Sequence, residues 1–205
     1  MTIRLEKLAK RFNYEWIFRD ITLTFEEGKA YAITGPNGSG KSTLMRILSG
    51  QLSPSQGELS FLQNGQKITP DEVFQYVAYA APYMDLIDEF TLSEFLSFHC
   101  SLRPMRNNMH VPELIDAMGL KAHTHKQIRS FSSGMKQRVK LLVACFTQSK
   151  IVLLDEPATN LDNAGYSWYI DIVQPVLKES IVIVASNIER EYTFCTDHLN
   201  IMGYK

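Results

Sequence analysis

Short segments in which apolar and polar residues alternate fill the first third of the chain. Residues 2–8 (TIRLEKL) and 20–25 (DITLTF) follow this pattern, which is typical of strands with one buried face. Residues 29–34 (KAYAIT) then lead through a glycine-rich turn into an amphipathic helix that starts at Lys41 and is closed by Gly50. The pattern predicts two further strands, at residues 57–62 (GELSFL) and 74–80 (FQYVAYA).

The spacing of apolar residues becomes helical in the middle of the chain. Residues 92–100 (LSEFLSFHC) and 112–120 (PELIDAMGL) have the periodicity of amphipathic helices. Beyond them, residues 151–154 (IVLL) and 181–184 (IVIV) are entirely apolar. Short apolar runs bounded by turns are typical of buried parallel strands. We therefore predict an α/β fold that begins with a β-rich part and carries a helical insertion in its middle.

The composition excludes several classes of protein. The 205 residues carry a net charge of −1 and an apolar fraction of 45%, so the chain can bury a core but lacks the basic surface expected for nucleic-acid binding. Three cysteines without CxxC spacing favour a reducing compartment. No segment reaches the roughly 18 apolar residues of a membrane span, and the N-terminus lacks the apolar core of a signal peptide. A role at a membrane would therefore need a separate chain that crosses it.

Residues 35–42 (GPNGSGKS) satisfy the phosphate-loop pattern G-x-x-x-x-G-K-[ST], with a predicted strand before them and a helix after them. Glycines allow backbone amides to turn inward around phosphate oxygens, and the helix N-terminus faces the same anion. In this pattern Lys41 would neutralise phosphate charge, and the Ser42 hydroxyl would hold Mg²⁺. The plainer interpretation is a glycine turn that only caps a helix. The predicted nucleotide-binding residues are Gly35, Pro36, Asn37, Gly38, Ser39, Gly40, Lys41, Ser42 and Thr43.

Two adjacent carboxylates, Asp155 and Glu156, follow the apolar run at residues 151–154. Ligands of open α/β sheets gather at the carboxyl ends of the strands. Asp155 could therefore hold Mg²⁺ beside Ser42, and Glu156 could polarise a water molecule aimed at the γ-phosphate. A strand that simply leaves the core would end in the same way, and the phosphate loop upstream is what favours the catalytic interpretation.

Residues 131–138 (FSSGMKQR) indicate a family. They resemble the signature LSGGQxQR of ABC-type ATPases, with Phe131 in place of the leucine and Met135 in place of the first glutamine. Serines before a helix are also ordinary N-caps. The resemblance therefore depends on the order of phosphate loop, signature, carboxylate pair and TNLD at 159–162, and it covers about residues 2–202. The signature positions are Ser132, Ser133, Gly134 and Met135, and Asp162 is the aspartate of the D-loop.

The resemblance implies a P-loop NTPase fold of the ABC ATPase type over residues 1–205. An N-terminal antiparallel β part and a RecA-like parallel core would together form the nucleotide-binding core, from residues 1–82 and 140–205. Residues 83–139 would form a helical subdomain that carries the signature. In this family the signature completes the ATP site of the opposite subunit, so the chain would pair with a second copy or with a homologous ATPase subunit.

The same resemblance implies cofactors, partners and location. ATP and Mg²⁺ would be the cofactors, and a separate integral membrane permease would dock against the helical subdomain. The protein would be cytoplasmic and peripheral at the inner face of the cell membrane. An aromatic side chain near the N-terminus would stack on adenine, where Phe12 aligns best and Tyr14 and Trp16 are close alternatives.

Two positions depart from the family pattern. The family's Q-loop glutamine falls at Pro82, which offers no side-chain oxygen and stiffens the segment. The family's histidine falls at Asn187, whose amide can donate a hydrogen bond but cannot take up a proton. Losing one transition-state donor costs roughly 10²–10³ in rate. Slow hydrolysis is therefore expected, with Glu156 as the base and Asn187 as a weaker donor.

The primary hypothesis is an ATPase that powers a membrane ABC transporter, and the signature is most similar to those of compact exporters. The alternative is a degenerate regulatory or assembly subunit that binds ATP and hydrolyses little or none, which Asn187 and Pro82 favour and Glu156 disfavours. A soluble ABC protein of ribosomes or DNA would be expected to carry paired cassettes or long coiled coils. A GTPase is disfavoured because the chain has no N-K-x-D motif.

Overall fold

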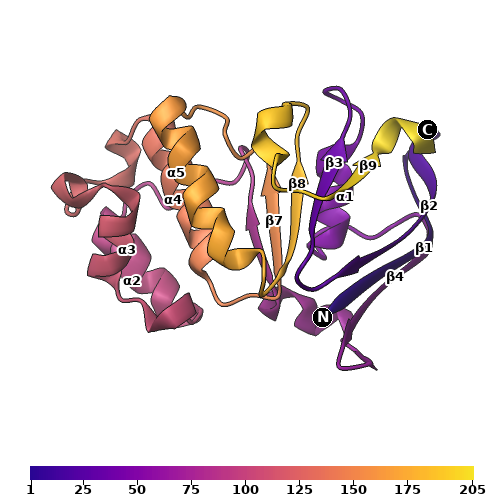
Figure 1. The fold of residues 1–205 in the computed structure, drawn as a ribbon, viewed down its shortest axis with the longest axis horizontal. Coiled ribbons are helices and arrows are strands. Elements are labelled where there is room, and N and C mark those ends of the chain that lie inside the picture. The colour runs from indigo at the N-terminus through magenta and orange to yellow at the C-terminus, as the bar shows by residue number, and fades with distance from the viewer.

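Helix α1 (Lys41–Leu48) lies between two β-sheets, and the longer helices gather on the far face of the second sheet (Figure 1). The computed structural model describes residues 1–205. The first sheet is antiparallel with strand order β2-β1-β4-β5, and the second has the order β6-β7-β8-β3-β9 with every neighbouring pair parallel. This arrangement confirms the predicted α/β fold, with an antiparallel N-terminal part followed by a parallel core.

The antiparallel sheet forms because one face of its strands is apolar, and in β1 the alternating residues Ile3 and Leu5 are fully buried. A bulge interrupts the pairing of β1 with β4. Beside it, Gly57 has a φ of 80°, and a Cβ there would lie 2.2 Å from the carbonyl oxygen of Lys7. Only glycine therefore fits at this position. The strands are β1 (Thr2–Phe12), β2 (Glu15–Glu26), β4 (Gln56–Gln63) and β5 (Gln66–Lys67).

The parallel sheet lies at the centre of the molecule. Its strands β7 and β8 are buried at every residue, which explains their continuous apolar sequences. One face of the parallel sheet packs against α1, which separates it from the antiparallel sheet. The other face packs against α4 and α5. The carboxyl ends of all five strands meet at one edge, where α/β sheets bind ligands. The strands are β3 (Ala30–Thr34), β6 (Val77–Ala80), β7 (Ile151–Asp155), β8 (Ile181–Ala185) and β9 (Asp197–Asn200).

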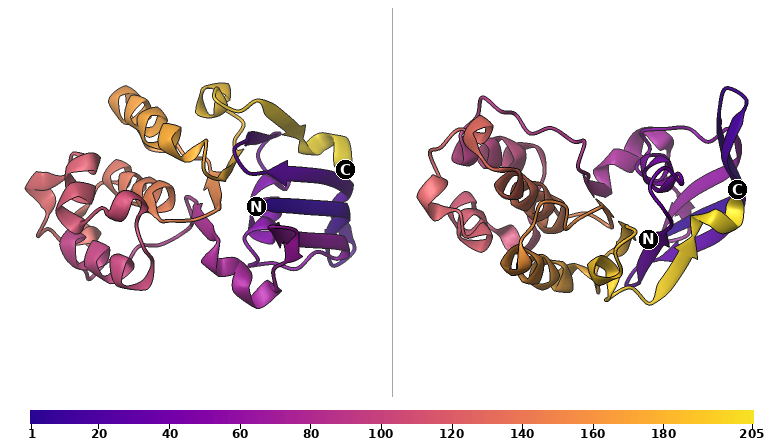
Figure 2. Two further views of the ribbon diagram at one scale, coloured as in Figure 1. Left: turned by 60° about the horizontal axis from the view of Figure 1, so that its bottom comes forward. Right: turned by 90° about the horizontal axis from the view of Figure 1, so that it is seen from above.

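A helical part stands at one end of the molecule, with the antiparallel sheet at the other end (Figure 2). Helices α2 and α3 share a separate apolar cluster with α4. None of the helices combines the length and the apolar character that a bilayer crossing requires. The helices are α2 (Leu92–Leu102), α3 (Val111–Met118), α4 (Ser133–Phe146) and α5 (Asn163–Val173), with 3-10 turns at Pro70–Gln75, Arg106–Asn108, Lys121–His123, Ile128–Ser130, Gln174–Val176, Glu189–Tyr192 and Ile201–Tyr204.

The structure differs from the sequence prediction around residue 74. The strand predicted at residues 74–80 is confined to β6, because a 3-10 turn at Pro70–Gln75 comes before it. Thr69 starts this turn, and its backbone N–H donates to the carboxylate of Glu72 at 3.3 Å, as in a capping box. Strand β9 escapes prediction for a different reason, since only one of its four residues is buried.

Candidate functional site

The phosphate loop connects the carboxyl end of β3 to the start of α1. Gly35 and Gly40 have φ values of 147° and 105°, which L side chains rarely adopt. A Cβ at Gly40 would lie 2.5 Å from Cγ2 of Ile17 on β2. Packing against β2 therefore fixes the loop at the N-terminus of α1, where backbone amides favour an anion.

Lys41 is buried at the first position of α1, with 4% of its surface exposed. Its ammonium donates to the carbonyl oxygens of Gly35 at 2.9 Å and Pro36 at 3.2 Å. Because an ammonium has three donors, these bonds hold the charge inside the loop and leave a donor for an anion. The Ser39 hydroxyl oxygen of the same loop is buried without a hydrogen-bond partner. This set of groups suits a phosphate.

Asp155, the last residue of β7, is only 1% exposed. Its Oδ2 accepts a hydrogen bond from the Tyr79 hydroxyl at 3.4 Å, whereas its Oδ1 is buried without a partner. The pKa of Asp155 is raised, mainly by burial and also by the charge of Glu156, although the nearby Ser42 hydroxyl acts to lower it. An unpartnered buried carboxylate oxygen is costly, and a hard divalent cation would satisfy it. Asp155 and Ser42 therefore fit a magnesium ion.

Glu156 follows β7 with a φ of 46°, which places a non-glycine residue in the left-handed region. Its backbone N–H still donates to the carbonyl oxygen of Ala185 at 2.8 Å, so pairing with β8 continues while the chain turns. The backbone N–H of Thr159 donates to the carbonyl oxygen of Glu156 at 3.2 Å and closes the turn. Strained residues that are held by their surroundings cluster at functional sites. The strain supports Glu156 as a functional residue.

Asn187 contacts the phosphate loop from the end of β8. Its side-chain amide donates to Oδ1 of Asn37 at 3.3 Å, although the two residues are 150 positions apart. The preceding residue, Ser186, is fully buried. Its hydroxyl donates to Oε2 of Glu191 at 2.7 Å and accepts the backbone N–H of Ile188 at 2.9 Å. These bonds anchor the segment that presents Asn187 to the loop.

Glu191 is a residue that sequence reasoning misses. A carboxylate in a polar segment is expected to be exposed, yet Glu191 is only 1% exposed. Burial raises its pKa, and the hydrogen bond from Ser186 lowers it. The sequence offers only a weak signal, a glutamate shortly after the serine that ends the last apolar run.

Glu191→Gln is expected to stabilise the fold at neutral and alkaline pH. The folded-state pKa of Glu191 is raised, so its contribution to stability is greatest below its ordinary pKa and falls as the pH rises through the raised value. Glutamine keeps an acceptor for the Ser186 hydroxyl without the buried charge. The melting temperature should therefore exceed that of the native protein at about pH 8, with the gap closing toward about pH 4. Glu189→Gln, a control at an exposed position, should have the melting temperature of the native protein at every pH. A melting temperature of Glu191→Gln below that of the native protein at alkaline pH would refute the expectation.

The signature and D-loop segments pack directly against each other. Ser132 caps α4, because its hydroxyl accepts the backbone N–H of Met135 at 3.2 Å. Asp162 caps α5 in the same way, with a bond of 2.7 Å. A Cβ at Gly134 would lie 2.9 Å from the carbonyl oxygen of Asn160, so a larger residue would push the D-loop backbone away. Both residues thus also cap helices, as the plainer interpretation predicts for the serines of the signature.

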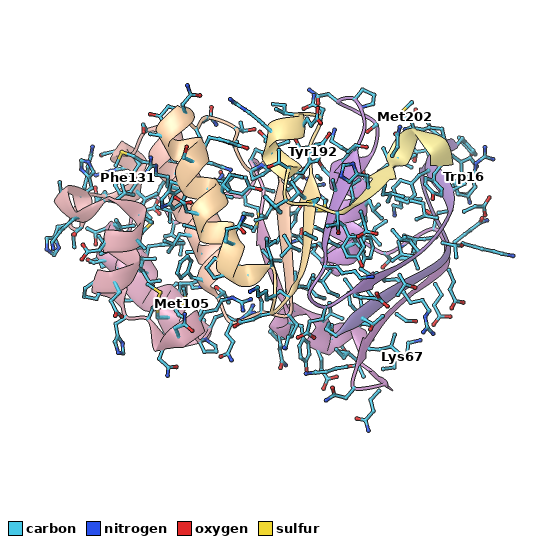
Figure 3. All side chains as sticks on the ribbon, viewed as in Figure 1. Trp16, Lys67, Met105, Phe131, Tyr192 and Met202 are labelled. Atoms are coloured by element: carbon cyan, nitrogen blue, oxygen red, sulfur yellow. The ribbon has the colours of Figure 1, made fainter.

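The structure does not bring the signature to the phosphate loop of the same chain. Phe131, which directly precedes the signature serines, lies at the opposite end of the long axis from Trp16 (Figure 3). Helix α1 and α4 lie on opposite faces of the parallel sheet. The phosphate loop, Asp155, Glu156 and Asn187 therefore form one group of predicted residues, and the signature forms another.

Phe12 lies at the end of β1 with 48% of its surface exposed. The Lys10 ammonium lies 5.1 Å from the centroid of its ring. The alternative aromatic Trp16 is covered by the guanidinium groups of Arg11 and Arg19, at 5.5 and 5.9 Å from the ring. The half-exposed ring of Phe12 is thus more accessible than Trp16, whereas the other alternative, Tyr14, is 96% exposed. Contact of any of the three with adenine stays a prediction.

Pro82 lies in the connection from β6 to the helical part. Its carbonyl oxygen accepts a hydrogen bond from the Lys140 ammonium of α4 at 2.9 Å. The ring of the next residue, Tyr83, lies 4.4 Å from the Arg46 guanidinium of α1. Gln75, the nearest glutamine upstream, precedes β6 and lines a separate polar cavity of about 680 Å³. Gln75 is therefore at the wrong end of the strand to replace a side chain at position 82.

Comparisons with known proteins agree with this arrangement. A family model described as ABC transporter matches residues 18–159. YcbN of Bacillus subtilis, an uncharacterised ABC transporter ATP-binding protein, is 27% identical over 98% of this chain and 66% of its own length. The cytochrome c biogenesis ATP-binding export protein CcmA of Agrobacterium fabrum is 29% identical over 91% of this chain and 88% of its own length. The ATP-binding cassette MJ0796, solved as a post-hydrolysis dimer with ADP and phosphate, has the same fold, with a TM-score of 0.82 and 21% identity over 97% of this chain and 94% of that one.

Proposed function

The chain belongs to the ABC transporter family, and on this premise we propose that it is the ATP-binding, ATP-hydrolysing subunit of a membrane transporter. One observation carries the proposal. Three segments far apart in the sequence meet at one edge of the parallel sheet, namely the phosphate loop after β3, Asp155 and Glu156 at the end of β7, and Asn187 after β8. A group of this kind matches what phosphoryl transfer to water requires.

Each of these residues would have a separate task. Lys41 and the loop amides would bind the phosphates, and Asp155 with Ser42 would hold Mg²⁺, which supplies charge neutralisation when bound. Glu156 would take the proton of the attacking water. Asn187, placed by its bond to the loop, would donate a hydrogen bond to the γ-phosphate.

A second subunit would complete the ATP site. Ser132 and Ser133 are exposed at the N-terminus of α4, which packs on the opposite face of the sheet from α1. A two-fold dimer would place this helix N-terminus against the γ-phosphate held by the partner. The dimeric structure of MJ0796 supports this assembly. In this proposal residues 1–82 and 140–205 act as the nucleotide-binding core, and residues 83–139 act as the helical subdomain.

A permease segment would dock beside the helical subdomain. An apolar cavity of about 240 Å³ lies between β6, α2 and α4. On α2, Phe98 is 44% exposed and Leu102 is 63% exposed, and Phe74, in the 3-10 turn before β6, is 63% exposed. Where exposed apolar side chains form a contiguous patch, they mark an interaction site. We propose an exporter because the relative CcmA is named an export protein, and this assembly would place the chain at the cytoplasmic face of the membrane.

Asn187→His is expected to raise steady-state ATP hydrolysis by on the order of ten-fold, because histidine can donate as a cation whereas asparagine donates only as a neutral amide. Asn187→Ala should be slower than the native chain, since it loses the donor that contacts Asn37. Phosphate release by the three proteins tests this order. Tight ATP binding without turnover in all three would instead favour a degenerate regulatory or assembly subunit, the alternative that Pro82 and Asn187 suggest.

A further inference from the structure

Tyr83 lies where the connection after β6 enters the helical part, and it is held from two sides. The Arg46 guanidinium of α1 lies 4.4 Å from the centroid of its ring, within the range of a cation–π contact. The Lys140 ammonium of α4 donates to the two preceding carbonyl oxygens, those of Ala81 at 3.4 Å and Pro82 at 2.9 Å. Tyr83 is thus fixed between α1, the helix that follows the phosphate loop, and α4, the helix that carries the signature.

The hydroxyl of Tyr83 contacts the hydroxyl of Tyr79 on β6. The two rings meet edge to face with centroids 6.4 Å apart, a favourable arrangement for aromatic pairs. The Tyr79 hydroxyl also lies 3.4 Å from Oδ2 of Asp155. An ionised carboxylate only accepts hydrogen bonds, so Tyr79 donates to Asp155 and its own oxygen accepts from Tyr83. Donation therefore runs in one direction, from Tyr83 through Tyr79 to Asp155.

This chain of donors reaches one carboxylate oxygen of Asp155 and leaves the other without a partner. At 3.4 Å, the bond from Tyr79 to Asp155 is long and weak by itself. A second hydroxyl that donates to Tyr79 polarises this bond and fixes its direction. Tyr83 therefore contributes to the orientation of Asp155 without contacting it.

From this geometry, and resting on the proposed function, we infer that Tyr83 is a positioning residue for the magnesium site. Through Tyr79 it holds the Asp155 carboxylate so that Oδ1 is available to the cation beside Ser42. Pro82 lacks the side-chain oxygen that the family pattern places in this segment, and the tyrosine pair gives the same segment another route to the metal. The orientation of Asp155 thereby depends on the position of the helical part that begins beyond Tyr83.

Tyr83→Phe removes the hydroxyl and keeps the ring over Arg46, so the fold should be retained. The measurement is the affinity for a non-hydrolysable ATP analogue, first with Mg²⁺ and then with excess EDTA. We expect the gain in affinity from Mg²⁺ to fall about three- to ten-fold in Tyr83→Phe, with the metal-free affinity unchanged. Tyr76→Phe is the matched control, because Tyr76 lines the polar cavity at the other end of β6, and it should keep the native gain.

A double-mutant cycle separates positioning from a merely structural role. Tyr79→Phe already removes the hydroxyl that links Tyr83 to Asp155, so adding Tyr83→Phe should not lower the Mg²⁺-dependent gain in affinity any further. If the losses in the two single variants add up in the double variant, or if Tyr83→Phe keeps the native gain in affinity, the inference is wrong while the proposed function stands. A native protein whose affinity does not depend on Mg²⁺ would overturn the metal site of the proposed function and this inference with it.

Discussion

Glu156→Gln is expected to lower steady-state ATP hydrolysis by at least about 10²-fold while ATP still binds, because general-base catalysis contributes roughly 10²–10⁴ in rate. Glutamine has nearly the same shape as glutamate, but its amide cannot accept a proton from water. The strained turn that presents Glu156 is held by backbone hydrogen bonds, which the substitution leaves in place. Phosphate release at saturating ATP measures the loss, and a binding titration shows that the nucleotide site is intact.

The matched control for this variant is Glu89→Gln, an exposed carboxylate in the helical part, which should keep the native rate. In the proposed dimer, ATP that is bound between the two subunits and not hydrolysed would hold them together, so Glu156→Gln should also accumulate a species of twice the 23.4 kDa chain mass when ATP is added. Native turnover in Glu156→Gln would show that another group activates the water.

Lys41→Ala is expected to weaken ATP binding by roughly 10²–10⁴-fold, in line with the 3–5 kcal/mol that loss of one partner of a buried charge pair costs. The ammonium is buried and is held in the loop by the carbonyl oxygens of Gly35 and Pro36. A titration with ATP measures the change. Lys178→Ala, at an exposed position, should bind as the native chain does, and unchanged affinity in Lys41→Ala would place the phosphates elsewhere.

The conformation of the glycine-rich loop at residues 35–42 could be predicted from the sequence because it is set locally. Consecutive residues set the backbone turn, the helix start and the position of Lys41. The pair Asp155 and Glu156 was also accessible to prediction, since a fully apolar strand had to end there. The position of Asn187 beside the phosphate loop could be expected only through the family resemblance, because Asn187 and its partner Asn37 are 150 positions apart.

Contacts that depend on tertiary packing could not be predicted. The sequence shows Tyr79 and Tyr83 as two aromatics near a turn, and only the pairing of β6 with β7 brings Tyr79 to Asp155. The burial of Glu191 likewise follows from the packing of its segment against Ser186. The strand predicted at residues 74–80 was wrong at its start because a capping box competes with the apolar pattern.

The most direct test is to mix Lys41→Ala and Ser133→Arg, two variants that are each expected to be inactive, in equal amounts and to measure ATP hydrolysis by the mixture. The first lacks a working phosphate loop, and the second carries a bulky cation at the exposed signature position that would face the partner's phosphate. A mixed dimer has one site in which an intact loop faces an intact signature. Random pairing makes about half of the dimers mixed, and each mixed dimer has one working site out of two. If two copies of the chain share each ATP site, the mixture should therefore recover up to roughly a quarter of the native rate. No recovery from two folded variants would contradict an ATP site completed by a second copy of this chain.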